Sequence, residues 1–390
     1  MKRVLKTAGL ALFMFNLSGI TLVQADIFEN IKERRRALSE KGLSFEPSYM
    51  VDYFVNTQGG LQRKDTYLGN LDLVFTVDTG KLGLWENGTF RAHMIDNSGE
   101  PKLTGEIVGD LQGISNIEGP RRNWLYELWY EHAFSENLSV LAGIHDHNSE
   151  FDVTEYGGLY INGSFGIGPE ISAGARPSIF PMTAPVVRAK ITPNEQWQLL
   201  LGVYDGDPGD PDVSKHIARS DFDKEGGAFF ASEAAYFFTG DALPGFIKLG
   251  AWYNTGEFAD VIDVDDNGDP VVRDGNTGGY LVVDKMLYRE DGEQGLGAFV
   301  QFGSNRKNVN EVNRYVGAGL NYHGLIPGRD QDDFGIAFAQ AQITDDLIDA
   351  GGRNDHETTI EATYRAQVTE HISLQPDLQY VINPGGVSDV

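Results

Sequence analysis

The sequence predicts an all-β protein: a transmembrane antiparallel β-barrel of about sixteen strands, preceded by a short N-terminal periplasmic helix. Three observations support this fold class. The chain begins with an export signal, apolar and polar residues alternate along many segments, and the links between these segments are short on one side and long on the other. Strict alternation is the period-2 pattern of a sheet with one apolar and one polar face. In a membrane barrel the apolar face meets lipid and the polar face surrounds a wet interior.

The export signal occupies residues 1–25. Three basic residues, Lys2, Arg3 and Lys6, precede an apolar run, and Val23-Gln24-Ala25 provides a small-residue cleavage site. The run is too short and too well terminated to favour a retained membrane helix. We therefore divide the chain into a signal peptide (1–25), an N-terminal helix (26–42) and an outer-membrane barrel domain (43–390).

The N-terminal helix is expected over residues 26–41. Asp26 can cap it, Ile27, Ile31 and Leu38 fall on one stripe, and Gly42 follows as a stop. Its basic cluster, Lys32 to Arg36, is most simply a solvated face. Contact with a partner or with lipid headgroups is the alternative interpretation.

Composition limits the classes of function. The chain has no cysteine, which excludes a disulfide scaffold, a thiol nucleophile and a Cys-based metal site. Its formal net charge of -26 argues against a nucleic-acid partner. Beyond the export signal no segment offers the ~18 continuous apolar residues that a spanning helix needs, so any membrane insertion must use strands. The 47 glycines suit bends and tight turns in curved sheets.

Fifteen segments beyond Gly42 are predicted to be strands. They lie near residues 44–56, 69–78, 88–96, 124–133, 138–147, 183–191, 196–205, 228–238, 246–255, 280–289, 295–303, 315–323, 333–342, 356–367 and 371–382. Long loops are expected at 97–123, 148–182, 206–227 and 256–279. Single-chain bacterial barrels use even numbers of strands, and an open barrel would leave unpaired edges in lipid. Because the chain stops soon after Pro384-Gly385-Gly386, we expect the final closing strand to be missing from it.

Four segments resemble a known family. They are "LSEKGLSFEPSYMVDYF" (Leu38 to Phe54), "GLYINGSFGIGPEISAGARPSIFPMTAPVVRAKI" (Gly158 to Ile191), "LGVYDGDPGDP" (Leu201 to Pro211) and "LQPDLQYVINPGG" (Leu374 to Gly386). The chain is similar here to the carbohydrate-selective porins of the OprB family. The resemblance implies a sixteen-stranded outer-membrane barrel with inward-folded loops and passage for mono- and small oligosaccharides. It also implies a final strand ending in an aromatic residue, which this chain lacks before it stops at Val390.

If the apolar faces meet lipid, the opposite faces line the lumen. Alternation then directs inward the side chains of Arg91, His93, Glu127, Trp129, Glu131, Arg188, Lys190, Lys248, Trp252, Glu361 and Arg365. A sugar path needs donors and acceptors that replace hydration water, flat apolar faces for pyranose C–H groups, and binding weak enough to permit release. The set offers both charge signs and two Trp rings. The alternative, for each charged residue, is that it pairs across the wall and only holds the barrel's shape.

Arg176 lies in the predicted 148–182 loop, which is long enough to fold into the pore. Its rigid fork of donors suits vicinal hydroxyls or carboxylates, so it joins the candidate sugar path. The alternative is that it pairs with a loop carboxylate such as Glu170 and fixes the loop.

An acidic segment, "DVDDNGDPVVRD" from Asp263 to Asp274, matches the D-x-D-x-N-G pattern of a calcium loop. Its candidate ligands are Asp263, Asp265, Asn267, Asp269 and Asp274. An acidic exterior loop is the simpler interpretation, because the usual Glu at the twelfth position is replaced by Asp and flanking helices are absent. No other cofactor is expected.

We therefore expect a passive porin for carbohydrates in the outer membrane of a Gram-negative bacterium, and no enzymatic activity. One alternative is a general porin or a porin for anions and acidic solutes. Another is a barrel enzyme such as a lipase, which needs a Ser–His pair on its lipid-facing side that no motif here supplies. The expected partners are small sugars and outer-membrane lipid, with a homo-oligomer left open and nucleic acid excluded.

Overall fold

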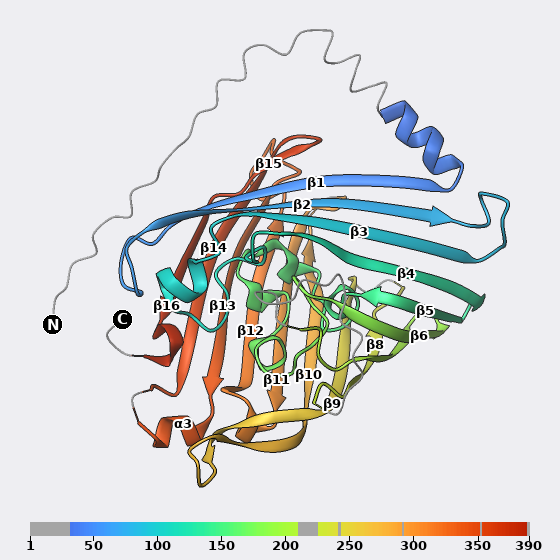
Figure 1. Cartoon of the computed structure of the whole chain (residues 1–390). Coiled ribbons are helices and arrows are strands. Elements are labelled where there is room, and N and C mark those ends of the chain that lie inside the picture. Colours follow the sequence, from blue (N-terminus) through green and yellow to red (C-terminus); the bar gives the residue numbers. More distant parts are fainter. Residues whose placement is uncertain (1–31, 210–224, 241–242, 291, 352, 388–390) are drawn as a thin grey trace.

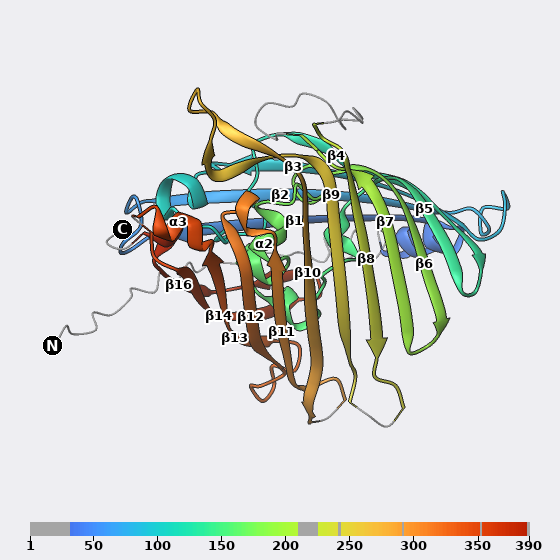
Figure 2. The same ribbon diagram turned by 90° about the horizontal axis from the view of Figure 1, so that it is seen from below.

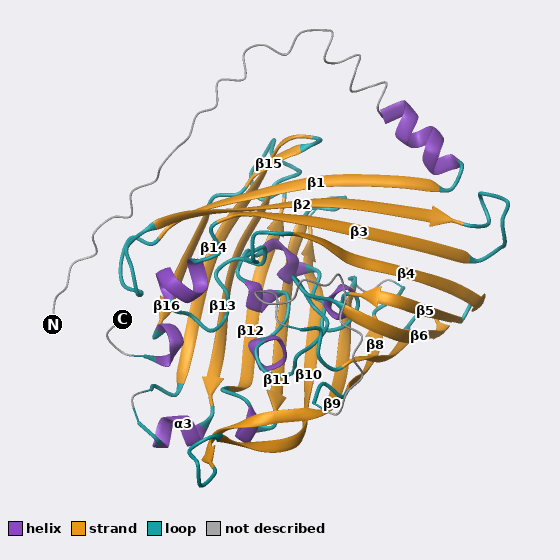
Figure 3. Ribbon diagram, viewed as in Figure 1, coloured by secondary structure: helices purple, strands orange, loops and turns teal. Residues whose placement is uncertain are grey.

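A sheet of sixteen strands, paired antiparallel in chain order, makes up most of the regular structure (Figure 3). The structure is a computed structural model that describes residues 32–209, 225–240, 243–290, 292–351 and 353–387 of the 390-residue chain. Its strands are β1 (Leu43–Val55), β2 (Asp65–Asp78), β3 (Gly88–Gly99), β4 (Asn123–Ser135), β5 (Leu138–His145), β6 (Ala184–Asn194), β7 (Trp197–Asp205), β8 (Ala228–Phe237), β9 (Gly245–Val264), β10 (Pro270–Arg289), β11 (Gly295–Asn305), β12 (Val312–His323), β13 (Asp333–Ile343), β14 (His356–Thr369), β15 (Ile372–Leu374) and β16 (Asp377–Ile382). The prediction of an antiparallel sheet with about sixteen strands is confirmed.

Two predicted segments differ in detail. The segment 371–382 is split into β15 and β16, which both pair with β14 on either side of Pro376. Proline has no N–H group to donate to the ladder, which accounts for the break. The predicted long loop at 256–279 is wrong, because β9 and β10 continue through it as a hairpin of two 20-residue strands. A short turn suffices there, since the Asp265 carboxylate accepts the backbone N–H groups of Asn267 and Asp269.

The two faces of the sheet have inverted polarity. Leu249 and Tyr380 are 65% and 66% exposed, whereas the charged residues Glu233 and Glu361 are 1% and 0% exposed. A water-soluble sheet buries its apolar face, so this distribution fits a barrel whose outer surface meets lipid. The predicted assignment of faces holds for the opening hairpin, where Phe75 is exposed and the inward-facing Thr76 and Arg91 are half-buried.

Short helices occupy the links. They are η1 (Leu103–Val108), η2 (His147–Ser149), η3 (Tyr156–Leu159), η4 (Gly163–Phe165), α2 (Pro169–Ser172), η5 (Lys307–Val309), α3 (Asp345–Asp349) and η6 (Pro384–Gly386). Residues 32–40 form the described part of the predicted N-terminal helix. The predicted signal peptide lies outside the described residues. No helix in the described part of the chain has the length and apolar character to cross a membrane.

The first and last strands face each other across an open seam. Within the described residues no pairing joins β1 to β14, β15 or β16. The link 100–122 lies across this seam: Ser115 Oγ donates to Asp52 on β1 (2.8 Å), and Gln379 Nε2 on β16 donates to the Ile114 carbonyl (2.9 Å). The link therefore ties the first strand to the last one, and the expected closing strand stays a prediction.

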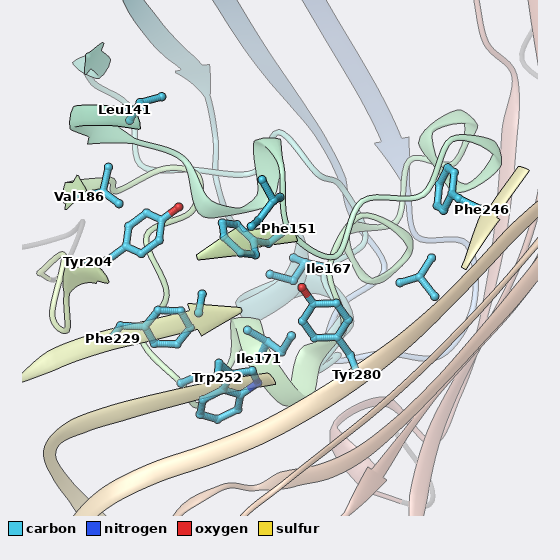
Figure 4. Close-up of a cluster of buried hydrophobic side chains, with 14 residues drawn as sticks. Leu141, Phe151, Ile167, Ile171, Val186, Tyr204, Phe229, Phe246, Trp252 and Tyr280 are labelled. Carbon is cyan, nitrogen blue, oxygen red and sulfur yellow. The ribbon is translucent and has the colours of Figure 1, made fainter. Parts of the chain in front are cut away.

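Residues 146–183, which we call the inner loop, run through the space enclosed by the sheet. Figure 1 and Figure 2 both show this segment, in green, between the first strands and β9–β12. Phe151, Ile167 and Ile171 of the loop join Tyr204, Phe229 and other wall residues in one buried apolar cluster (Figure 4). The long loop predicted at 148–182 to enter the pore thus does so.

Candidate functional site

Wall carboxylates hold the inner loop by its backbone. The Glu361 carboxylate on β14 accepts the N–H groups of Ile161 (2.7 Å) and Asn162 (3.0 Å). Asp284 on β10 accepts those of Glu155 and Tyr156 in the same manner, at 2.9 and 3.0 Å. Each such hydrogen bond contributes about 0.5–1.5 kcal/mol net, and a buried N–H group left without a partner would cost about 1–3 kcal/mol. Two distant strands therefore fix the loop across the barrel.

A third anchor lies on β8 and β9, next to β10 in the sheet. Glu233 on β8 accepts the backbone N–H of Asp152 (2.9 Å), and Lys248 on β9 donates from Nζ to the Val153 carbonyl (2.9 Å). Lys248 Nζ also lies 3.7 Å from Glu233 Oε1. Lys248 and Glu361 point inward as predicted, but both are covered by the loop. Their contacts support the shape-holding alternative for these two residues.

Trp252 also points inward and is covered. Its ring stacks on Phe229 (centroids 5.9 Å apart, 21° between planes), and only 3% of the residue is exposed (Figure 4). Ile171 of α2 belongs to the same cluster. The predicted Trp252 thus packs under the inner loop and offers no open ring face to a solute.

Seven of the predicted residues come together on β3, β4 and β6, and we call this set the lumenal patch. Its members are Arg91, His93, Glu127, Trp129, Glu131, Arg188 and Lys190. Arg91 and Lys190 keep 33% and 31% of their side chains exposed, so the patch is accessible to water. Trp129 lies on β4 between Glu127 and Glu131 and pairs across the ladder with Arg91.

One half of the lumenal patch is centred on Glu127. Arg91 Nε donates to Glu127 Oε2 (3.1 Å), and His93 lies between Glu127 and Asp72, with Nε2 2.9 Å from Asp72 Oδ1. Trp129 Nε1 donates to the other oxygen of Glu127 (3.4 Å). The Trp ring is therefore tethered beside a fixed pair of opposite charges.

The other half is centred on the buried guanidinium of Arg188. Its Nη1 donates to Glu131 Oε1 (2.9 Å) and its Nη2 to Glu150 Oε1 (2.9 Å), while Nε lies 2.6 Å from Glu150 Oε2. Lys190 Nζ lies 2.7 Å from Glu150 Oε1. Glu150 belongs to the inner loop, so this network joins the loop to the barrel wall at the edge of the lumenal patch.

Two further predicted residues lie away from the patch. Arg176 donates from Nη2 to the Glu257 carbonyl (2.8 Å) and stacks over Phe258 (4.1 Å). Its Nη1 also lies 4.0 Å from Oδ2 of Asp207, a carboxylate in the loop after β7, so it contacts a loop carboxylate other than the suggested Glu170. Arg365 on β14 donates to Asp333 on the neighbouring β13 (2.7 Å). Neither lies with the seven residues of the patch.

Glu170, in α2 of the inner loop, is buried against the wall next to Gly303 of β11. Burial raises the pKa of its carboxyl to about 8. Burial also raises the pKa of Asp152 well above its ordinary value, and the nearby Glu170 and Glu233 add to this effect. The inner loop thus carries carboxyl groups that favour the neutral form where they meet the wall.

The predicted calcium ligands do not converge. The Asp263 carboxylate pairs with Arg273 (2.5 Å), Asp265 accepts backbone N–H groups of its own turn, and Asp274 lies on β10 opposite Glu257. Among the described residues, no group of three or more His, Cys, Asp or Glu side chains is placed to hold a metal ion. This arrangement favours the simpler interpretation, an acidic exterior hairpin.

Sequence reasoning missed three anchors, Glu150, Glu233 and Asp284. Glu233 on β8 and Asp284 on β10 alternate with outward-facing residues of their strands. This period-2 pattern could have indicated that both carboxylates point into the barrel. Glu150 lies in an irregular segment, where no periodicity indicates its direction.

Comparison with known proteins agrees with this geometry. The model of the family described as carbohydrate-selective porin, OprB family, matches residues 62–390. The chain belongs to the OprB family. Porins of this family are outer-membrane proteins of Gram-negative bacteria, and the barrel described above is accordingly an outer-membrane sugar porin.

Relatives of the OprB family extend the match over nearly the whole chain. The chain is 24% identical to porin B of Pseudomonas aeruginosa over 92% of its length and 86% of that protein. It is 26% identical to the putative porin QuiX of Acinetobacter baylyi, covering 91% of this chain and 88% of that one. The high-pH structure of Pseudomonas putida OprB superposes with a TM-score of 0.82 at 22% identity, covering 92% of this chain and 93% of that chain. This likeness shows that the barrel fold is shared.

Proposed function

We propose that small neutral sugars diffuse passively through the lumen along the lumenal patch. The observation that carries this proposal is the half-buried ring of Trp129, which pairs across the ladder with water-accessible Arg91 in a patch that also holds water-accessible Lys190. An aromatic face can stack on the C–H face of a pyranose, while ionic groups supply donors and acceptors in place of hydration water. Such contacts are individually weak, which permits release.

The charges of the patch support a preference for neutral solutes. Arg91, Arg188 and Lys190 face a similar number of carboxylates, since Glu127, Glu131 and Glu150 pair with them directly. Neither sign is in clear excess, so a strong preference for anions or cations is not expected. The anion-porin alternative predicts a large reversal potential in a salt gradient, and the sugar path predicts a small one.

We infer transport without catalysis. Ser149 Oγ lies 3.2 Å from His145 Nε2, but it also donates to the Asp146 carbonyl (2.7 Å). His145 Nδ1 faces the hydroxyl of Tyr204 (3.2 Å), where a catalytic triad would place a carboxylate. The pair also lies at the inner loop, away from the lipid-facing side that a lipase would use. A homo-oligomer stays a prediction.

The test is sugar block of ion current in planar bilayers, with the Trp129→Ala variant compared with the parent. Losing a stacking contact worth on the order of 1 kcal/mol should weaken sugar affinity about fivefold while conductance in plain salt stays nearly unchanged. Trp252→Phe is the matched control, because this ring is covered and should not affect sugar affinity. An unchanged affinity in Trp129→Ala would contradict the proposed path.

A further inference from the structure

The N-terminal helix lies at the end of the barrel where the short links gather. Lys32 Nζ lies 3.2 Å from Glu370 Oε2 in the link after β14, and the Gly42 carbonyl accepts the N–H of Asp78 at the end of β2 (2.8 Å). Figure 1 shows the helix beside the start of β1, near the link between β2 and β3. Short links of outer-membrane barrels face the periplasm, so the helix sits at the periplasmic rim.

The helix is locally basic in a strongly acidic chain. Residues 32–41 contain five basic residues (Lys32, Arg34, Arg35, Arg36 and Lys41) and two acidic ones (Glu33 and Glu40), against a net charge of -26 for the whole chain. Arg34, Arg35 and Arg36 are all exposed, and Arg36 pairs with Glu40 on the same helix (3.2 Å). The helix therefore carries a net positive charge within a negatively charged protein, and its surface attracts anions.

Apolar side chains lie next to this basic helix. Lys81 of the link 79–87 and Asp78 at the end of β2 lie against Gly42, just after the helix, and the link exposes Leu82, Leu84 and Trp85. Trp85 packs against Phe90 (6.0 Å) and donates from Nε1 to the Tyr130 hydroxyl (2.7 Å) on the outer face of the barrel. The exposed apolar residues are therefore continuous with the lipid-facing wall.

We propose that the basic segment 32–41, which includes helix 32–40, and link 79–87 form a docking surface for anionic phospholipids of the periplasmic leaflet. The arginines bind headgroup phosphates as Leu84 and Trp85 enter the boundary of the acyl chains. Arginine matches phosphate geometry with its planar fork of donors, and Trp favours membrane interfaces. An acidic protein partner would also be attracted by the arginines. Its binding would not require exposed apolar residues that continue into the lipid-facing wall. The lipid accounts for both features.

Native mass spectrometry of the folded protein in detergent tests this proposal, with phosphatidylglycerol or phosphatidylcholine added. We expect tighter retention of phosphatidylglycerol by the parent. The triple variant Arg34→Gln/Arg35→Gln/Arg36→Gln should bind it on the order of 100-fold more weakly, since each basic residue near an anionic surface contributes roughly a fivefold factor. Rising salt should weaken the parent and leave the triple variant nearly unaffected.

The matched control, Arg63→Gln/Lys64→Gln/Lys102→Gln, removes three positive charges at the opposite end of the barrel and should keep the parent's lipid affinity. Leu84→Ser tests the apolar part and should weaken retention without changing charge. Equal retention of the two lipids by the parent, or equal loss in both triple variants, would overturn the proposal. A change in oligomer mass without a change in lipid retention would also overturn it, in favour of a protein partner. Sugar block of current is measured separately and is expected to be unchanged in every variant.

Discussion

Arg188 is predicted to set the position of the inner loop at the lumenal patch. Its guanidinium is 1% exposed and joins Glu131 of the wall to Glu150 of the loop through contacts of 2.6–2.9 Å. The substitution Arg188→Met keeps a long flexible side chain of similar reach and removes the charge. Glu131 and Glu150 then face each other without their shared cation.

The loss of stability in Arg188→Met depends on the charged groups that remain around Glu131 and Glu150. Removing one member of a buried ion pair costs roughly 3–5 kcal/mol. Both carboxylates keep some contact with water, and Lys190 still lies 2.7 Å from Glu150, so we expect the low end of this range, about 3 kcal/mol. The ratio of docked to undocked loop should accordingly fall on the order of 100-fold. Glu150→Gln in the Arg188→Met background removes the repulsion between Glu131 and Glu150 and should recover part of the loss.

Single-channel recording measures this effect as current noise and conductance, and gel mobility before and after heating reports folding. Arg188→Met should show frequent conductance fluctuations and weaker sugar block. Arg365→Met is the matched control, because Arg365 pairs with Asp333 and does not contact the inner loop in the structure. If Arg188→Met folds and keeps the parent's noise and sugar affinity, the loop is not held by this network.

Three further predictions concern packing, pH and sidedness. A Cβ at position 303 would overlap the Glu170 carboxyl, so Gly303→Ala should lower the free energy of unfolding in urea by about 1–3 kcal/mol, whereas Gly158→Ala, with open space around it, should cost much less. The pKa of Glu170 is raised from its ordinary 4.5 to about 8, so the folded state holds a proton that the unfolded state loses. Stability should therefore fall as pH rises from about 4.5 to 8, and Glu170→Gln should flatten this dependence in urea titrations; an unchanged slope would show that Glu170 does not cause it. In this cysteine-free chain a water-soluble thiol reagent should label Arg91→Cys through the lumen and spare Phe75→Cys, and the reverse pattern would contradict the assignment of faces.

The strands and their faces could be predicted because alternation is a local property. Phe75 and Arg91 follow from their places in the opening hairpin, and the structure places the first outward and the second on the lumenal patch. Local signals failed at 256–279, where Asp, Asn and Gly residues predicted a long loop. The same residues instead make a tight turn within a long hairpin.

The covering of residues by the inner loop could not be predicted from the sequence. Trp129 and Trp252 both alternate inward, yet Trp252 stacks on Phe229 beneath α2 while Trp129 stays half-buried. Similarly, Arg176 contacts the Glu257 carbonyl, 81 residues away in the chain, and the loop carboxylate of Asp207, which the sequence did not single out. Such contacts depend on the path of an irregular segment, which period-2 patterns do not describe.

The most direct test of the proposed sugar path is protection of an introduced thiol. Thr76 lies on β2 opposite Arg91, and Arg365 lies on β14, away from the lumenal patch. Thr76→Cys and Arg365→Cys are each treated with a water-soluble thiol reagent in liposomes, with and without a saturating neutral sugar. Sugar should slow modification several-fold at position 76 and leave position 365 nearly unaffected. Equal rates with and without sugar at position 76, under conditions where the sugar still blocks current, would contradict a path along the lumenal patch.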